Sequence, residues 1–443
     1  MWGGIFLLDM DHRQKIERIV EQLSERPEGA SVKFVRDGVS HKVPNSQGNA
    51  GMAHEVIVPK LNEILEIDPK TMTCTAESGV TFFDLVQETL KHGLVPYTVP
   101  ELKTITIGGA VAGSSVESMS YKYGGFHDSC LEYEVISASG EVLTCSPEEN
   151  PDLFHMMHGT FGTVGMLTKL KFRLHPAQKF VKMTYEKYAT FAEYQAAIQS
   201  YYKRGEHDFV DGIIHGPDHF TLCIGNFVDE APYVNRYDGM KIFYKSTAER
   251  TEDFMRTQDY FFRYDRECHW LSRNFGLENK VLRALFGRWF LSSTNMIKAA
   301  KRLKWFFKGK RPDVVVDVFV PMSRFADFYD FYEREFDYYP LWIVPYRIPK
   351  KYPWLNESFM KNVDDELFID CAIYGFRQKD GQDYYRLLDE KLVELRGIKT
   401  LISHNQYDEN TFWKIYSREN FERVKAASDP ENVFGDLYKK THR

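Results

Sequence analysis

The stretch that decides between two nucleotide-binding folds is GTFGTVGMLTKLKFRL, which runs from Gly159 to Leu174. Its three glycines have the spacing GxxGxxG, close to that of the phosphate loop in a doubly wound dinucleotide-binding domain. Such a loop must open a helix, because the N-terminus of the helix holds the pyrophosphate. Here apolar and polar residues alternate after Gly165, and a period of two predicts a strand. We therefore expect an α+β domain whose cofactor loops lie between strands.

A second glycine-rich stretch, TITIGGAVAGSS, runs from Thr104 to Ser115 and contains no charged residue. Glycine lets a backbone approach a phosphate or a flat cofactor closely, and it equally suits a tight turn between buried strands. The run GGAVAG lacks the spacing GxGxxG, so it does not favour a doubly wound domain either. The glycine count by itself leaves both uses open.

The composition is globular and excludes several classes of protein. A net charge of −6 argues against a generic nucleic-acid binder. The six cysteines lie at least 15 residues apart and include no CxxC, which argues against disulfides and zinc and favours a reducing, cytoplasmic compartment. No run of about 18 apolar residues occurs, so we expect no transmembrane segment. The opening MWGGIFLL predicts either a strand or the remnant of a longer, trimmed N-terminus.

The chain divides into three predicted parts, because its composition changes after Pro176. Residues 1–175 predict an α+β domain that holds both glycine-rich stretches. Residues 176–405 predict a second, aromatic-rich α+β domain with strands at 314–321 and 367–376. Residues 406–443 predict a helix that stops near Asp429, followed by a segment that docks back on the first domain.

Four motifs in this order resemble the vanillyl-alcohol-oxidase (PCMH) type of FAD-binding domain. They are RDGVSH (Arg36–His41), TITIGGAVAGSS, GTFGTVG and DPENVF (Asp429–Phe434). From about residue 60 onward, and nearly residue by residue over 100–154, the chain resembles the delta(24)-sterol reductases. It departs from that family around residues 34–47, where the first pyrophosphate loop is weakly matched, and it lacks the family's N-terminal membrane segment. The resemblance implies that residues 1–175 bind FAD and that residues 176–405 form a substrate (cap) domain.

The same resemblance implies a reaction. We expect reduction of a carbon–carbon double bond in a sterol-like or isoprenoid lipid, with NAD(P)H as the electron donor. One alternative is an FAD-dependent alcohol or sugar oxidase or dehydrogenase, because the fold supports both directions of hydride transfer. The other is a lipid-binding protein without enzymatic activity. The sequence names neither the lipid nor the oligomeric state.

The glycine-rich stretches supply the residues expected to contact FAD. They are Thr104, Thr106, Ile107, Gly108, Gly109, Gly113, Ser114, Ser115, Glu117, Ser118, Tyr123 and Gly124, with Gly159, Gly162, Thr163, Val164 and Gly165. Glu117 is equally consistent with a cap or a salt bridge to Lys122 or another neighbour, and Tyr123 with plain packing. His41 lies near the position of covalent attachment in some flavoproteins of this fold, but its spacing from Arg36 favours noncovalent FAD.

A reductase of this kind needs an acid that protonates one carbon while hydride reaches the other. His404 and Tyr407, in SHNQYDENTFW, are candidates because this stretch joins the second domain to the tail. Tyr374 is the third catalytic candidate. Tyr346 is a further pocket candidate, and His269, in RECHW, ranks below the others.

Residues 280–312 contain ten lysines or arginines and no acidic residue, with leucine, phenylalanine and tryptophan between them. Such a stretch suits peripheral contact with an anionic membrane, which would give a water-soluble enzyme access to a lipid. The alternative is a solvated helix face whose aromatic residues lie in the core.

Overall fold

Strand β8 (Met166–Pro176) confirms the alternating pattern, since every second side chain from Thr168 to Leu174 is buried. It belongs to a computed structural model that describes residues 10–36, 53–295, 314–349, 351–379, 381–403 and 405–442. β8 lies in a six-stranded sheet of order β3-β4-β8-β6-β7, with β5 also paired to β8. The other strands are β3 (Ile64–Asp68), β4 (Thr73–Glu77), β5 (Leu94–Pro96), β6 (Cys130–Ile136) and β7 (Val142–Cys145). All these pairs are antiparallel, so this is not a doubly wound sheet.

The stretch TITIGGAVAGSS forms a short helix, α3 (Ile107–Gly113), where a loop was expected. Thr106 caps the helix, because its hydroxyl accepts a hydrogen bond of 3.1 Å from the Gly109 amide. Gly108 lies against Ser78, whose Cβ would be 2.7 Å from a Cβ at position 108. Close packing against the sheet therefore accounts for one of the three glycines. The other helices of this unit are α2 (Phe82–Thr89), α4 (Ser120–Tyr123), α5 (Pro151–Met156) and the 3-10 turns η1 (Leu90–His92) and η2 (Phe126–Ser129).

The N-terminal helix α1 (His12–Ser24) begins at a capping box on Asp11, and its buried side chains include Ile16, Ile19 and Leu23. Strands β1 (Val32–Val35) and β2 (His54–Ile57) pair in parallel beside it. The connection between them, residues 37–52, lies outside the described residues. The motif RDGVSH and its candidate His41 fall there, except for Arg36.

The second unit is an eight-stranded sheet of order β12-β9-β11-β10-β14-β15-β13-β16. Its strands are β9 (Phe180–Tyr188), β10 (Phe209–Gly216), β11 (His219–Val228), β12 (Glu252–Arg256), β13 (Val314–Pro321), β14 (Leu341–Arg347), β15 (Leu367–Phe376) and β16 (Ile398–Lys399). The helical elements between them are α6 (Phe191–Arg204), α7 (Phe243–Glu249), α8 (Thr257–Phe261), η3 (Leu271–Phe275), α9 (Lys280–Phe290), η5 (Met322–Arg324), α11 (Phe325–Glu335), α12 (Glu357–Met360) and α13 (Tyr384–Leu395).

The two faces of this sheet pack against different partners. Val316, Val318 and Val320 of β13 share a core with helices α6, α11 and α13. Phe319 and Tyr346 point the other way and join the core of the six-stranded unit. Because successive strand residues alternate between faces, residues 317, 370 and 374 also lie on this second face. Side chains of both units therefore meet at this second face of the eight-stranded sheet. The fold as a whole is α+β.

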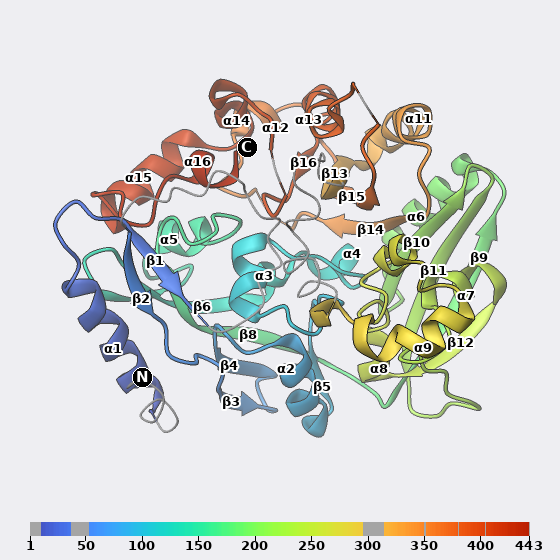
Figure 1. The fold of residues 1–443 in the computed structure, drawn as a ribbon, viewed down its shortest axis with the longest axis horizontal. Helices are drawn as coiled ribbons and strands as arrows, with labels where there is room; N and C mark the ends of the chain where they lie inside the picture. The colour runs from blue at the N-terminus through green and yellow to red at the C-terminus, as the bar shows by residue number, and fades with distance from the viewer. Residues whose placement is uncertain are drawn as a thin grey trace.

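The C-terminal segment packs on the first unit, where its helix α15 (Arg418–Ser428), red in Figure 1, lies beside α5. The helices of this segment are α14 (Glu409–Ile415), α15 and α16 (Leu437–Thr441). The Ala138 amide donates to the Ser428 carbonyl (2.9 Å), and the Lys425 ammonium donates to the Thr163 carbonyl (2.6 Å). The predicted end of the helix near Asp429 is confirmed, while the domain boundaries at 175 and 405 stay predictions.

Candidate functional site

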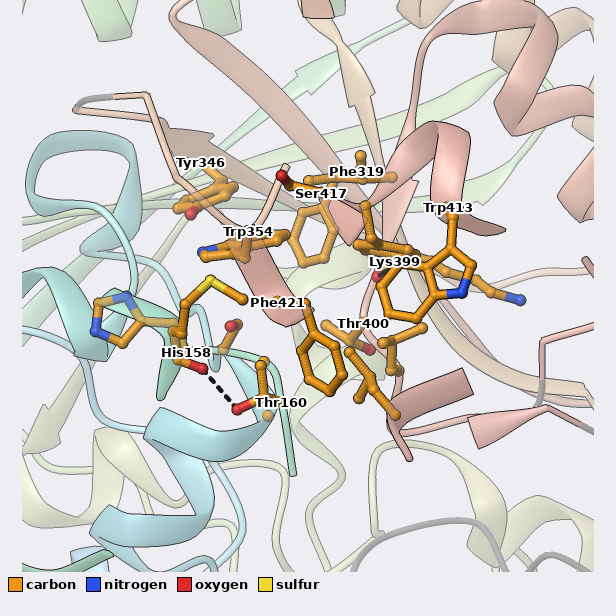
Figure 2. Close-up of a pocket in the computed structure, with 18 residues that line it drawn as sticks. His158, Thr160, Phe319, Tyr346, Trp354, Lys399, Thr400, Trp413, Ser417 and Phe421 are labelled. Atoms are coloured by element: carbon orange, nitrogen blue, oxygen red, sulfur yellow. Dashed lines mark hydrogen bonds between the residues drawn. The ribbon is translucent and has the colours of Figure 1, made fainter. Parts of the chain in front are cut away.

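A cavity lies where α3, the loop after α5, the β13–β16 edge of the large sheet and the C-terminal helices meet (Figure 2). Aromatic side chains from the large sheet and the C-terminal part dominate its lining. They are Phe319, Tyr346, Trp354, Trp413, Tyr416 and Phe421. From the other side, Gly113, Ser114 and Gly159 line it, and all three are among the predicted FAD contacts. An aromatic wall opposite a glycine-rich backbone suits a flat, mostly apolar ligand.

Polar groups on the glycine side fit the oxygens of a flavin nucleotide. Ser114 caps α3 in the left-handed conformation (φ 54°), and its buried hydroxyl has no hydrogen-bond partner among the described residues. Leaving such a group unpaired costs about 1–3 kcal/mol, which a ligand oxygen would recover. No atom lies within 4 Å of a Cβ built at Gly113, so the cavity has room next to this hydroxyl.

The remaining predicted contacts between residues 104 and 115 already have structural partners or lie away from the cavity. Thr106 caps α3, Ile107 is in the core and the Gly108 amide donates to the Ser78 carbonyl (2.8 Å). Gly109 is exposed, Thr104 is half-buried, and the Ser115 amide donates to the Ala110 carbonyl (2.9 Å). Their contact with FAD stays a prediction.

In the motif GTFGTVG, only Gly159 and its neighbour Thr160 line the cavity. Gly162 has a φ of 71°, which favours glycine, and the Thr163 hydroxyl donates to the Thr160 carbonyl (2.7 Å). Val164 is buried in the core, and a Cβ at Gly165 would overlap Val135. The structure thus supplies turn and packing reasons for this part of the motif, while cofactor contact stays a prediction.

Glu117 forms a buried ion pair, not with Lys122 but with Arg263, which the sequence did not single out. The distance from Arg263 Nη2 to Glu117 Oε1 is 2.8 Å, and the same nitrogen lies 3.1 Å from Asp211 Oδ2. Burial raises the pKa of Glu117 to about 7, with Arg263 opposing the shift, and it also raises the pKa of Asp211. Ser118 hydrogen-bonds to the Glu117 carboxylate and to the Tyr260 hydroxyl.

Tyr123 and Gly124 have packing partners on the first unit. The Tyr123 ring stacks on Tyr97 at a centroid distance of 4.5 Å and lies 5.5 Å from the His175 ring. Gly124 has a φ of 80°, and a Cβ there would overlap the Asp128 carboxylate. These contacts favour the packing alternative for Tyr123.

Of the catalytic candidates, Tyr374 lies beside an ionisable partner next to the cavity. Its hydroxyl donates to the Asp317 carboxylate. Asp317 is two residues from Phe319 on the same face of β13, and its carbonyl accepts from the amide of the cavity-lining Thr400 (3.3 Å). Burial raises the pKa of Asp317 to about 6 and the pKa of Tyr374 well above its ordinary value. Tyr374 therefore keeps its proton, and Asp317 takes one up near neutral pH.

The other two candidates have different outcomes. Tyr407 is buried, and its ring lies 5.0 Å from the ammonium of Lys399, a residue that lines the cavity. The Tyr407 hydroxyl has no hydrogen-bond partner in the part of the chain that the structure describes, and burial raises its pKa. His404 lies outside the described residues. A catalytic role for either stays a prediction.

Several ionisable residues of the site were missed from the sequence. Asp211, Asp317 and Asp370 each stand alone in an apolar strand, in the stretches FVDGII, VVVDVFVP and LFIDCAIY. Aspartate is depleted in strands, so a lone aspartate in such a run is itself a signal for a polar site. Burial and the Asp317 charge raise the pKa of Asp370 well above its ordinary value. Glu101 and Arg263 had no comparable sequence signal.

The basic stretch 280–312 is described only up to residue 295. Helix α9 presents four large apolar side chains to solvent, with exposed fractions from 40% to 65%. They are Val281, Leu282, Leu285 and Phe286. Arg283 points to the protein instead, where it pairs with Glu267. Among the described residues, no helix is both long enough and apolar enough to cross a membrane.

The chain is similar in sequence to known proteins. A sequence family described as an FAD binding domain matches residues 12–146. The chain is 26% identical to the Delta(24)-sterol reductase of Homo sapiens, over 97% of this chain and 86% of that protein. It is 23% identical to the Delta(24)-sterol reductase of Arabidopsis thaliana (98% and 85%) and 22% identical to cytokinin dehydrogenase 5 of the same plant (87% and 75%). The expectation of an FAD-binding domain in the N-terminal part is confirmed.

Proposed function

Because the chain belongs to the delta(24)-sterol reductase group of FAD-binding flavoproteins, we propose that it reduces a carbon–carbon double bond in a sterol-like or isoprenoid lipid with electrons from NAD(P)H. At the coarser level, it is an FAD-dependent oxidoreductase acting on a carbon–carbon bond. The observation that carries the proposal is the Tyr374–Asp317 pair, which holds protons beside an aromatic cavity.

Bound FAD would supply the hydride that adds to one carbon of the double bond. Gly113, Ser114 and Gly159 would hold it on the side of α3, noncovalently. The aromatic residues opposite would orient an apolar substrate and exclude water. A doubly wound sheet would provide a separate binding site for NAD(P)H. Neither the six-stranded nor the eight-stranded sheet is doubly wound, so NAD(P)H and the lipid would bind in turn at the same site beside FAD.

The chain's own residues supply the proton for the second carbon. As the C–H bond forms there, the O–H bond of Tyr374 breaks and its electron pair stays on the phenolate. The Asp317 carboxyl group, hydrogen-bonded to that oxygen, returns a proton to it. Asp317 then regains a proton from solvent. General acid catalysis of this kind contributes roughly 100- to 10,000-fold.

Access to a lipid would come from the membrane surface. The exposed apolar residues of α9 and the acid-free composition of 280–312 support peripheral contact with an anionic bilayer. The solvated-face alternative predicts no such binding.

Anaerobic mixing of the FAD-loaded protein with NADPH distinguishes a reductase from an oxidase or dehydrogenase. We expect NADPH to bleach the flavin, and a sterol with a 24(25) double bond, or farnesol as an isoprenoid probe, to restore its colour. The rival oxidase or dehydrogenase is suggested by the similarity to a cytokinin dehydrogenase. Bleaching by an alcohol or an amine, together with no reaction with NADPH, would establish that rival. If the purified protein is colourless and does not bind added FAD, the remaining hypothesis is a lipid-binding protein without enzymatic activity.

A further inference from the structure

His269 has a strained backbone at the boundary between the two units. Its φ is 64°, and the preceding Cys268 has a φ of 44°. Non-glycine residues are strained in the left-handed region, so two in succession persist only where their surroundings require them. The side chain of His269 must therefore be held in this place by specific contacts.

Those contacts join the first unit to the catalytic candidate Tyr374. The distance from His269 Nε2 to Glu101 Oε1 is 2.7 Å, and both side chains are more than nine-tenths buried. The His269 ring lies against the Tyr374 ring, with a centroid distance of 4.2 Å. The next residue, Trp270, donates from its indole to the Tyr374 carbonyl (2.9 Å). His269 Nδ1 has no hydrogen-bond partner among the residues that the structure describes.

The charges around His269 come from every element packed against it. Glu101 precedes α3, Asp317 lies on β13, Asp370 and Tyr374 lie on β15, and Arg263 is on its own segment. Burial acts to raise the pKa of Glu101, but His269, a backbone hydrogen bond and Arg263 together lower that pKa. Glu101 is therefore ionised, and its carboxylate faces the His269 ring. The His269 ring in turn lies between this carboxylate and the phenol of Tyr374.

We infer that His269, held by Glu101, is a positioning residue for Tyr374, and that its imidazole ring against Tyr374 stabilises the phenolate left when Tyr374 protonates the lipid. The inference rests on the proposed function, because Tyr374 must have a substrate that accepts its proton. The alternative is that the His269–Glu101 pair only stabilises the contact between the two units. The two alternatives differ in whether added imidazole restores the rate of flavin reoxidation in a variant that lacks the His269 ring.

The test uses His269→Gly in the FAD-loaded protein. Glycine adopts positive φ freely, so this change removes the ring and relieves the backbone strain together. Cys268→Gly is the matched control, because it relieves the adjacent strained residue and leaves the ring in place. Stopped-flow absorbance follows flavin reduction by NADPH and reoxidation by the alkene probe separately, and bound FAD is quantified.

We expect His269→Gly to slow reoxidation by the alkene at least about 100-fold. Flavin reduction and FAD content should stay within twofold of the wild type, as should every property of Cys268→Gly. Added imidazole at pH 6.5 should restore reoxidation at least tenfold, since it can occupy the vacated space. Glu101→Gln should slow the same step, and Glu101→Asp should slow it less.

A reoxidation rate of His269→Gly within twofold of the wild type would overturn the inference. So would a loss that imidazole does not restore, or one that slows both half-reactions equally, because a structural brace predicts these results. If no alkene reoxidises the reduced wild-type flavin, the proposed function itself fails, and the inference fails with it. Normal wild-type turnover with an unaffected His269→Gly overturns only the inference.

Discussion

Single carboxylates in apolar strands define the chemistry of this protein at the scale of the residue. Asp317 lies between valines in β13, on the face that meets the first unit. Its burial raises its pKa to about 6. An ionised carboxylate in that place is costly, so the folded protein favours its protonated form. The same burial therefore moves the titration of Asp317 to about pH 6 and makes its ionised form unfavourable for stability.

Asp317→Asn should therefore stabilise the protein at alkaline pH while it impairs catalysis. Between pH 4 and 6 the folded state binds more protons at Asp317 than the unfolded chain, so stability falls as pH rises, and the loss is complete above about pH 6. We expect the substitution to raise the free energy of unfolding by about 1–3 kcal/mol at pH 8 and not at pH 4. Urea unfolding at both pH values measures this, and an equal effect at both would contradict it.

Gly113 gives a direct test of the FAD side of the cavity. Gly113→Leu places a side chain in space where no atom lies within 4 Å, next to the unpartnered Ser114 hydroxyl. We expect the affinity for FAD to fall at least about tenfold, and the melting temperature of the FAD-free protein not to fall, because leucine favours a helix end more than glycine. Titration with FAD and thermal unfolding measure the two effects.

The control for this change is Gly239→Leu in the second unit, where a Cβ likewise meets no atom within 4 Å. It should leave the affinity for FAD unchanged. Full FAD binding by the Gly113 variant would remove this cavity from the cofactor site.

At the scale of the element, helix α1 is docked on the six-stranded sheet by charges as well as by its apolar face. His12 lies 2.8 Å from Glu77 on one ring nitrogen and 2.8 Å from Glu134 on the other. Lys15, one turn later, pairs with Glu77 (3.0 Å). Hydrogen bonds to Glu134 and Glu77 raise the pKa of His12 to about 9, although burial opposes them. The docking of this helix therefore depends on pH.

His12→Gln should make the stability of the protein less dependent on alkaline pH. The raised pKa means that the contribution of His12 is fully present below pH 6.5 and is lost as pH rises through about 9. We expect the substitution to cost about 2 kcal/mol at pH 6 and little at pH 10. Chemical denaturation across this range measures it. Arg13→Gln is the control, because its pair with Glu17 is solvent-exposed, and it should show no such pH dependence.

At the scale of the whole molecule, one face of the eight-stranded sheet packs against the unit built on the six-stranded sheet, and residues of both share a core. The segment 260–270 lies between the two units, where Arg263 bonds Glu117 of one unit and Asp211 of the other. The C-terminal helices then return to the first unit (Figure 1). Their residues Trp413, Tyr416 and Phe421 line the cavity. On the outside, α9 leaves an apolar face uncovered among the described residues.

We expect this outer face to bind anionic membranes. The prediction is tested by changing four residues together to serine: Val281, Leu282, Leu285 and Phe286. Each large apolar side chain that inserts contributes about 1–2 kcal/mol, so pelleting with phosphatidylserine vesicles should be lost while FAD content is kept.

The matched control changes four exposed apolar residues of the first unit to serine: Ile57, Leu65, Met72 and Val142. It should pellet like the wild type. Binding should also weaken with salt, because the rest of 280–312 is basic. If both fourfold serine variants pellet equally with the vesicles, this face does not bind membranes, and the alternative of a solvated helix face holds.

The local patterns of the sequence predicted most elements correctly. The alternation after Gly165 identified β8, and the apolar runs identified β13 and β15 with their observed ends. These succeed because one buried face leaves its period in the sequence. The helix in TITIGGAVAGSS was missed, because three glycines lower its intrinsic propensity. The Thr106 cap and the burial of Ile107, Ala110 and Val111 stabilise it in the fold.

The sequence by itself determined the class of fold and the FAD-binding domain, because motif order and periodicity are local properties of the chain. Only the tertiary structure decided which charges meet. Glu117 pairs with Arg263, which is 146 residues away, and Glu101 pairs with His269, which is likewise distant in the chain. No local pattern encodes such pairs, because they depend on how two separately folded sheets face each other. The same packing removes water from Asp317, and this burial turns an ordinary carboxylate into an acid near neutral pH.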